Sequence, residues 1–140
     1  MRTRLLTLGT LVLVLAAGCE AAKPPRQGRI AGRVTLDGKP VPRGNVRFIA
    51  LGAGGVNVLA PIADGAFEVP EGQGPTKGKY RVEFSVPSVR TQQVMHPDRP
   101  GEWLEDRVET LPARYHRDSA FTLDYDPDDD APYTAVLTSQ

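Results

Sequence analysis

The 140-residue sequence contains a single cysteine, Cys19, so an intrachain disulfide is excluded. It has no excess of either charge, with 17 Lys and Arg against 17 Asp and Glu, and therefore lacks the basic surplus typical of nucleic-acid-binding proteins. Long helical stretches are also scarce, because 14 Gly and 13 Pro interrupt the chain. The hydrophobic content of 40% is nevertheless enough for a core, which excludes wholesale disorder.

The one long apolar run lies at the N-terminus. Arg2 and Arg4 precede an uncharged stretch that extends over residues 5–19. A helix needs about 20 apolar residues to span the bilayer core, and this stretch is shorter. The basic start followed by a short apolar run therefore indicates a secretion signal rather than a transmembrane helix.

Residues 15–19, with the sequence Leu-Ala-Ala-Gly-Cys, resemble the lipobox of bacterial lipoproteins. The resemblance implies that residues 1–18 are removed as a signal peptide and that Cys19 is lipidated as the first residue of the mature chain. Acyl chains on this residue would hold the protein stably on a membrane. Glu20 stands where the inner-membrane retention signal has Asp, which favours the periplasmic face of the outer membrane. The alternative is an ordinary secretion signal in which Cys19 stands by chance.

The mature chain depends on its lipid for membrane attachment. Removal of Arg2 and Arg4 leaves 15 basic and 17 acidic residues, a net charge of about −2 that gives no attraction to anionic lipid. Residues 19–27 comprise the lipidated Cys and a tether without large apolar side chains, whose eight residues 20–27 reach at most ~28 Å. We therefore expect the domain, residues 28–140, to lie close to the bilayer.

The domain alternates apolar and polar residues with the period of half-buried strands. The predicted strands cover residues 30–36, 45–51, 56–62, 66–69, 80–86, 121–125 and 133–138. Asp37-Gly38 and Asp64-Gly65 are typical of tight turns between them. The predicted core contains Val34, Val46, Phe48, Phe67, Tyr80, Val82, Phe84, Phe121 and Leu123. Seven short strands in about 110 residues predict an all-β sandwich rather than a βαβ fold.

Four segments of this domain resemble the carboxypeptidase regulatory-like domain. They are residues 32–42 (Gly-Arg-Val-Thr-Leu-Asp-Gly-Lys-Pro-Val-Pro), 46–48 (Val-Arg-Phe), 64–67 (Asp-Gly-Ala-Phe) and 78–82 (Gly-Lys-Tyr-Arg-Val). Residues 111–119 add a likeness to short bacterial lipoproteins of this type. The resemblance, over roughly residues 28–138, implies a seven-stranded transthyretin-like (prealbumin-like) sandwich. It implies no catalytic residue, because the matching positions are turn and core positions.

The acidic segment 124–130 departs from that pattern and suggests a calcium site. Asp124, Asp126, Asp128 and Asp130 alternate, and carboxylate oxygens at every second position suit Ca²⁺. An EF-hand loop would have Gly at position 129 and Glu at position 135, where this chain has Asp and Ala. The alternative that we favour is a solvated hairpin turn between the last two strands, whose charge blocks edge association.

Other candidate chemistry is weak. The glycines of residues 52–55 have no following helix and predict a turn rather than a phosphate site. His96 and His116 lack further ligands at metal spacing, and no nucleophile elbow is present. Tyr115 is expected to pack at a corner of the domain with its hydroxyl bonded to backbone. We therefore expect no enzyme activity and no cofactor.

Residues 87–112 have no clear period and are too long for an ordinary connection, which suggests function or disorder. They contain the only tryptophan, Trp103, among polar side chains. One hypothesis is that Trp103 binds a sugar or peptide by stacking. The alternative, which we favour from sequence because Trp is usually well buried, is that Trp103 folds back with Leu104 or Val108 over a sheet edge.

Two functions of different class remain. The first is a non-enzymatic, lipid-anchored module of the cell envelope with a binding or structural role, whose partner is an envelope glycan or protein. The second is an accessory subunit of a secreted or envelope hydrolase. Neither involves nucleic acid. A catalytic chain is a distant third, because no set of residues supports one.

Overall fold

The computed structural model describes residues 23–140, except for the side chains of residues 89–94 and 104–106. The expected signal peptide and lipid attachment site, residues 1–19, lie outside the described residues. No helix within the described part is long and apolar enough to cross a membrane.

The described chain is all-β, as the sequence predicts. It consists of β1 (Ile30–Leu36), β2 (Lys39–Pro40), β3 (Arg43–Ala50), β4 (Val58–Ala63), β5 (Ala66–Val69), β6 (Gly78–Ser85), β7 (Pro87–Met95), β8 (Trp103–Glu109), a 3₁₀ turn (Ala113–Tyr115), β9 (Thr122–Tyr125) and β10 (Tyr133–Leu137). The seven predicted strands correspond to β1, β3, β4, β5, β6, β9 and β10, with ends displaced by at most two residues. β2, β7 and β8 are the strands that the sequence analysis missed.

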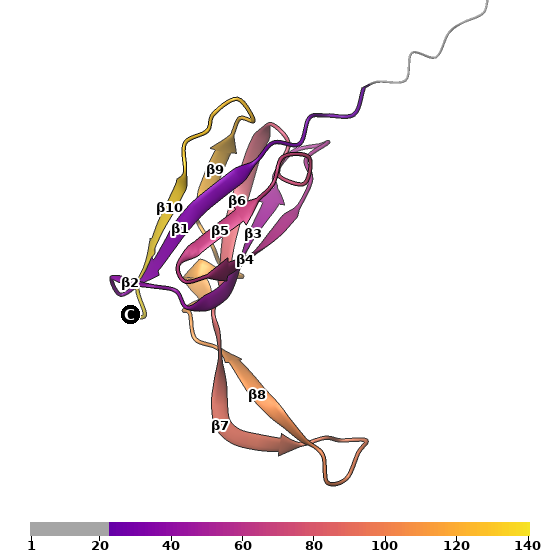
Figure 1. Cartoon of the computed structure of the whole chain (residues 1–140), viewed down its shortest axis with the longest axis vertical. Helices are drawn as coiled ribbons and strands as arrows, with labels where there is room; N and C mark the ends of the chain where they lie inside the picture. The colour runs from indigo at the N-terminus through magenta and orange to yellow at the C-terminus, as the bar shows by residue number, and fades with distance from the viewer. Residues whose placement is uncertain (1–22) are drawn as a thin grey trace, which may run out of the picture.

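The seven predicted strands form one curled sheet in the order β10-β1-β5-β4-β3-β6-β9, with the short β2 added to β1. Neighbours are antiparallel except β1 and β10, which are parallel. The curl brings Phe48 of β3 to 5.8 Å from Phe67 of β5 and 6.1 Å from Tyr133 of β10, measured between ring centroids. The two halves of the sheet thus enclose a core in a sandwich-like arrangement (Figure 1).

The tight turns form where the sequence predicts them. Asp37 and Gly38, between β1 and β2, have φ values of 50° and 77°. Asp64 and Gly65, between β4 and β5, have φ values of 50° and 75°. Two successive residues with positive φ give the turn whose twist matches that of paired strands, and Asp-Gly adopts it at low cost.

Most of the predicted core is buried. Seven of the nine predicted residues are buried: Val34, Val46, Phe48, Phe67, Tyr80, Val82 and Phe84. The other two, Phe121 and Leu123, are partly buried and pack against the core. Leu123 belongs to β9, an edge strand with a neighbour on one side only, and Phe121 precedes that strand. The register of β6 is as predicted, since Phe84 is completely buried.

The prediction of an irregular loop over residues 87–112 was wrong. β7 and β8 pair with each other in a separate two-stranded sheet and form a hairpin that projects from the body (Figure 1). We call this hairpin, residues 87–109, the arm. Its register shifts between Val89 and Gln93, so the apolar residues lose the period of two by which strands are recognised.

The arm and the incoming N-terminal segment lie at opposite ends of the body (Figure 1). At one end, the backbone N–H of Gly28 donates to the carbonyl oxygen of Pro75 at 2.9 Å, just before β6 begins. β6 then crosses the body to Ser85, and the arm starts two residues later. Strand β6 therefore connects the point of chain entry to the base of the arm.

Candidate functional site

The outer end of the arm exposes apolar side chains. Met95 and Trp103 face each other across the two strands and are 52% and 54% exposed. The next pair of the backbone register joins Val94 to Leu104. The interpretation favoured from sequence, in which Trp103 folds back over a sheet edge, was therefore wrong. Trp103 begins β8, which among the described strands pairs only with β7, so the arm holds Trp103 away from the body.

The turn beyond Met95 and Trp103 is built from local hydrogen bonds. The backbone N–H of His96 donates to the carbonyl oxygen of Glu102 at 2.8 Å, and Asp98 N–H donates to His96 Nδ1 at 3.1 Å. Arg99 forms an ion pair with Glu102 at 3.1 Å. An aromatic face surrounded by such polar groups can stack on a ligand and orient it. The arm tip, residues 95–103, is the first candidate site.

The base of the arm is fixed by Glu109. Its carboxylate accepts hydrogen bonds from the Ser85 hydroxyl at 2.6 Å, from Val86 N–H at 2.9 Å and from Leu111 N–H at 3.0 Å. Burial alone would raise the pKa of Glu109, but these hydrogen bonds together outweigh it and lower the pKa. His116 acts in the same direction through its charge. Glu109 is an ionised clamp between the arm and the sandwich.

Beside this base, a groove of about 560 Å³ runs along the polar face of β3 and β6. We call it the arginine groove, after its lining residues Arg47, Arg81 and Arg117. Leu59 of β4 also lines it and is 61% exposed. The sequence analysis missed this site. Arg47 and Arg81 are far apart in sequence, and only the pairing of β3 with β6 brings them onto one face.

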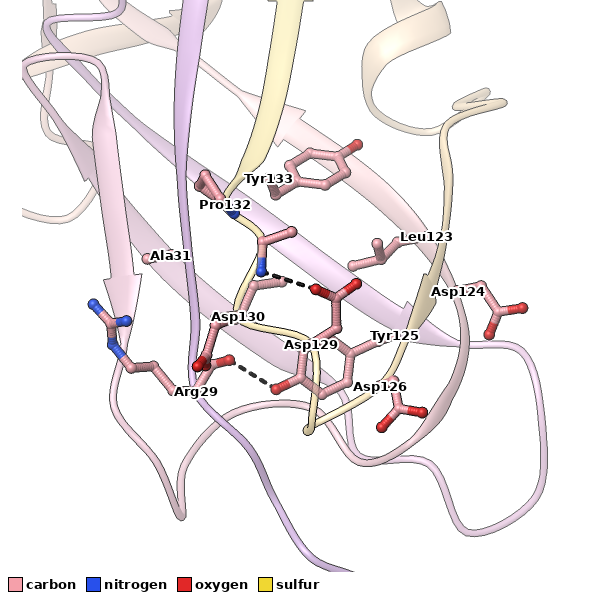
Figure 2. A pocket seen from close by; sticks show the side chains of 12 residues that line it. Arg29, Ala31, Leu123, Asp124, Tyr125, Asp126, Asp129, Asp130, Pro132 and Tyr133 are labelled. Carbon is pink, nitrogen blue, oxygen red and sulfur yellow. Dashed lines mark hydrogen bonds between the residues drawn. The ribbon is translucent and has the colours of Figure 1, made fainter.

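The acidic segment lies between the two edge strands rather than in a hairpin. β9 pairs with β6 and β10 pairs with β1, so residues 126–132 cross from one half of the sheet to the other. The expectation of a hairpin turn between the last two strands was wrong. A pocket of about 400 Å³ opens at this crossing, between the first residues of β1 and the strands β9 and β10 (Figure 2).

Three aspartates near this pocket each bind a different partner. Asp126 pairs with Lys77 at 2.7 Å, and Asp128 pairs with Arg26 at 2.7 Å. Asp129 accepts a hydrogen bond from Ala131 N–H at 3.0 Å. Asp124 points to the opposite side of the pocket from Asp130 (Figure 2). Among the side chains that the structure describes, no three acidic, His or Cys residues are placed together to hold a metal ion.

Near this pocket, hydrogen bonds to oppositely charged groups stabilise the ionised forms of Asp126 and Arg26. The hydrogen bond from Lys77, supported by Asp128 N–H, lowers the pKa of Asp126. Hydrogen bonds to Glu71 and then Asp128 raise the pKa of Arg26. Arg26 and Gln27, which the sequence analysis assigned to the tether, are therefore attached to the domain, with Gln27 bridged to Thr76. This end of the domain joins the acidic segment to the incoming chain.

Tyr115, His116 and His96 are the remaining residues that the sequence analysis considered. Tyr115 is buried, and its hydroxyl accepts a hydrogen bond from Thr138 N–H at 3.1 Å, which confirms the expected backbone bond. Arg114 lies 4.8 Å from the Tyr115 ring centroid, and hydrogen bonds with Thr138 and then Arg114 lower the pKa of this tyrosine. His116 lies against the carbonyl oxygen of Leu111, at 3.2 Å, while His96 is at the arm tip.

Comparison of the chain with known protein families, with curated proteins and with solved structures finds no match.

Proposed function

We propose that this chain is a non-enzymatic, lipid-anchored module of the cell envelope that presents the arm to a partner. In this proposal Cys19 is the lipidation site, residues 1–18 are the removed signal peptide, and the domain is a prealbumin-like sandwich. The partner is an envelope glycan or protein, and Trp103 is the residue that contacts it.

The observation that carries this proposal is the placement of the arm opposite the point of chain entry (Figure 1). A lipid on Cys19 would fix the end of the domain near Gly28 to the membrane. Because Arg26 and Gln27 are bound to the domain, six residues from 20 to 25 remain as tether and reach at most about 22 Å. Trp103 would then face away from the bilayer, where an envelope partner is accessible.

The position of the anchor leads us to propose export and attachment to the periplasmic face of the outer membrane. The lipobox-like residues 15–19 support export with lipidation, and Glu20 supports the outer membrane. The near-neutral charge of the chain gives no alternative electrostatic attachment. Acyl labelling tests this part: Cys19→Ser should give an unlabelled, unprocessed precursor. Continued lipid labelling of that variant would refute lipidation at Cys19.

Recovery of partners from native envelopes tests the presenting role. The lipidated wild-type chain should retain an envelope glycan or protein that Trp103→Ala loses. Leu51→Ala is the matched control for removing an exposed apolar side chain away from the arm, on the body of the domain and outside the arginine groove. A hydrolase as the retained partner would support the accessory-subunit function instead. Equal retention by wild type and Trp103→Ala would exclude Trp103 as the contact.

A further inference from the structure

The arginine groove lies over strands inside the sheet rather than over a sheet edge. β3 lies between β4 and β6, and β6 lies between β3 and β9. An extended peptide binds a sheet by adding a strand at an edge whose backbone groups lack a neighbour. β3 and β6 offer no such edge. A ligand in this groove is therefore recognised by side chains and not by backbone pairing.

An apolar side chain and a cation lie next to each other in the groove. The backbone register places Leu59 of β4 opposite Arg47 of β3, and Arg47 opposite Glu83 of β6. Cross-strand partners point to the same side of a sheet, so these three side chains are neighbours. Leu59 is 61% exposed and the Arg47 side chain is 58% exposed. The groove thus presents an apolar surface directly beside a guanidinium group.

Two of the three guanidinium groups have donors to spare. Glu83 accepts a hydrogen bond from Arg81 at 2.9 Å. The ion pair of Arg47 with Glu83 is 3.9 Å long, and that of Arg117 with Asp118 is 3.7 Å long. Both distances exceed that of a hydrogen bond. The exposed guanidinium groups of Arg47 and Arg117 can therefore each donate two parallel hydrogen bonds to an incoming carboxylate.

The charge of the groove favours a weakly charged anion over a nucleic acid. Three arginines and the carboxylates of Glu83 and Glu109 line it, which gives a net charge of about +1. The Glu109 carboxylate already accepts three hydrogen bonds, and the Glu83 side chain is only 13% exposed. A phosphate backbone needs several cations along its length, and this groove does not provide them.

We propose that the arginine groove binds an acidic polysaccharide whose sugar rings carry carboxylates. In a uronic acid the carboxylate is bonded to the ring itself, so the charge lies beside the apolar C–H face of the sugar. The adjacent Arg47 and Leu59 match this combination: Arg47 donates to the carboxylate, and Leu59 packs against the ring. Arg117 binds the carboxylate of a second sugar. This site is separate from the arm tip and requires neither Trp103 nor lipidation.

Binding to immobilised polygalacturonate tests the proposal with the full chain in detergent. The wild type should bind this polyuronate and should not bind dextran, a neutral polysaccharide. The double variant Arg47→Gln, Arg117→Gln should bind at least about tenfold more weakly, because it loses the charged donors to both carboxylates. Both positions are exposed, so the melting temperature of the variant should remain that of the wild type.

A charge-matched variant and a second polyanion are the controls. Arg33→Gln with Lys39→Gln removes the same charge from exposed positions outside the groove and should leave binding unchanged. No binding by the wild type, or an equal loss in this control, would overturn the proposal. Binding to polyglutamate as tight as to polygalacturonate would assign the groove to acidic peptides and would overturn it too.

Leu59→Asn separates recognition of the sugar ring from attraction between charges. The variant keeps all three arginines but lacks the apolar surface that a ring would cover, so binding to polygalacturonate should weaken by roughly threefold or more. Leu51→Asn, at an exposed position outside the groove, is the matched control. Unchanged binding by Leu59→Asn would contradict the contact with the sugar ring.

Discussion

The carboxylate of Glu109 accepts a 2.6 Å hydrogen bond from the hydroxyl of Ser85 and so joins the last residue of β8 to the last residue of β6. The same carboxylate accepts hydrogen bonds from the backbone N–H groups of Val86 and Leu111, which lie in the two chain segments that connect the arm to the body. Glu109 thus joins the two connecting segments where the arm leaves the sandwich, together with Thr110, whose backbone N–H donates to the carbonyl oxygen of Val86 at 3.2 Å.

Substitution of this clamp should loosen the base of the arm. Glu109→Gln keeps one oxygen acceptor but loses the charge, so the free energy of unfolding should fall by about 1 kcal/mol. A denaturant titration measures the loss. Glu68→Gln is the control, because Glu68 takes part in an exposed ion pair with Arg29 that is worth little. An equal effect of both substitutions would contradict the clamp.

The stability supplied by Glu109 should depend on pH in a defined direction. Its pKa is lowered in the folded protein from the ordinary value of 4.5, so the folded state favours the ionised form. The contribution is complete above about pH 4.5 and is lost as the pH falls through the folded-state pKa. Wild type and Glu109→Gln should therefore converge in stability on acidification. A difference that grows below pH 4.5 would contradict the lowered pKa.

The aromatic contact between Phe84 of β6 and Phe121, the residue before β9, is a second target. Phe84 is completely buried and packs edge-on against Phe121 at a centroid distance of 5.9 Å. Phe84→Ala should lower the free energy of unfolding by about 3–5 kcal/mol, because it removes core contacts and leaves a cavity. Val136→Ala, at a position 64% exposed, should change it by less than about 0.5 kcal/mol. A loss below 1 kcal/mol for Phe84→Ala would contradict its place in the core.

The parallel pairing of β1 with β10 requires a glycine. An added Cβ at Gly32 would lie 2.2 Å from the carbonyl oxygen of Tyr133 and 2.7 Å from the Phe67 ring. Gly32→Ala should therefore destabilise the domain by about 1–3 kcal/mol and separate β10 from β1. Hydrogen exchange should show faster exchange of amides in β10. Gly52→Ala, where nothing lies within 4 Å, should leave that exchange unchanged.

The sandwich-like body could be predicted from the sequence because its strands obey simple rules. Alternation identifies β1 and β6, and Asp-Gly pairs mark two of the turns at the residues where positive φ is found. Each of these signals is local. The sequence therefore indicated the elements and much of the core, while their order in the curled sheet required the structure.

The arm and the arginine groove could not be predicted for opposite reasons. In the arm, the register shift between Val89 and Gln93 removes the alternation, and none of the described side chains of β7 and β8 belongs to the main core. In the groove, the sequence does not distinguish Arg47 and Arg81 from other polar residues of alternating strands. Their proximity is a property of pairing between β3 and β6, and a single sequence does not reveal it.

The fluorescence of Trp103 tests whether its side chain is available to a partner. Trp103 is the only tryptophan and is 54% exposed, so the monomer should show red-shifted emission that a soluble quencher reduces. Binding of the proposed envelope partner would bury the ring, so the emission should shift to the blue and quenching should weaken when solubilised envelope is added. Blue-shifted emission without quenching in the protein alone would show that Trp103 is buried within its own chain, and would remove it as a contact residue.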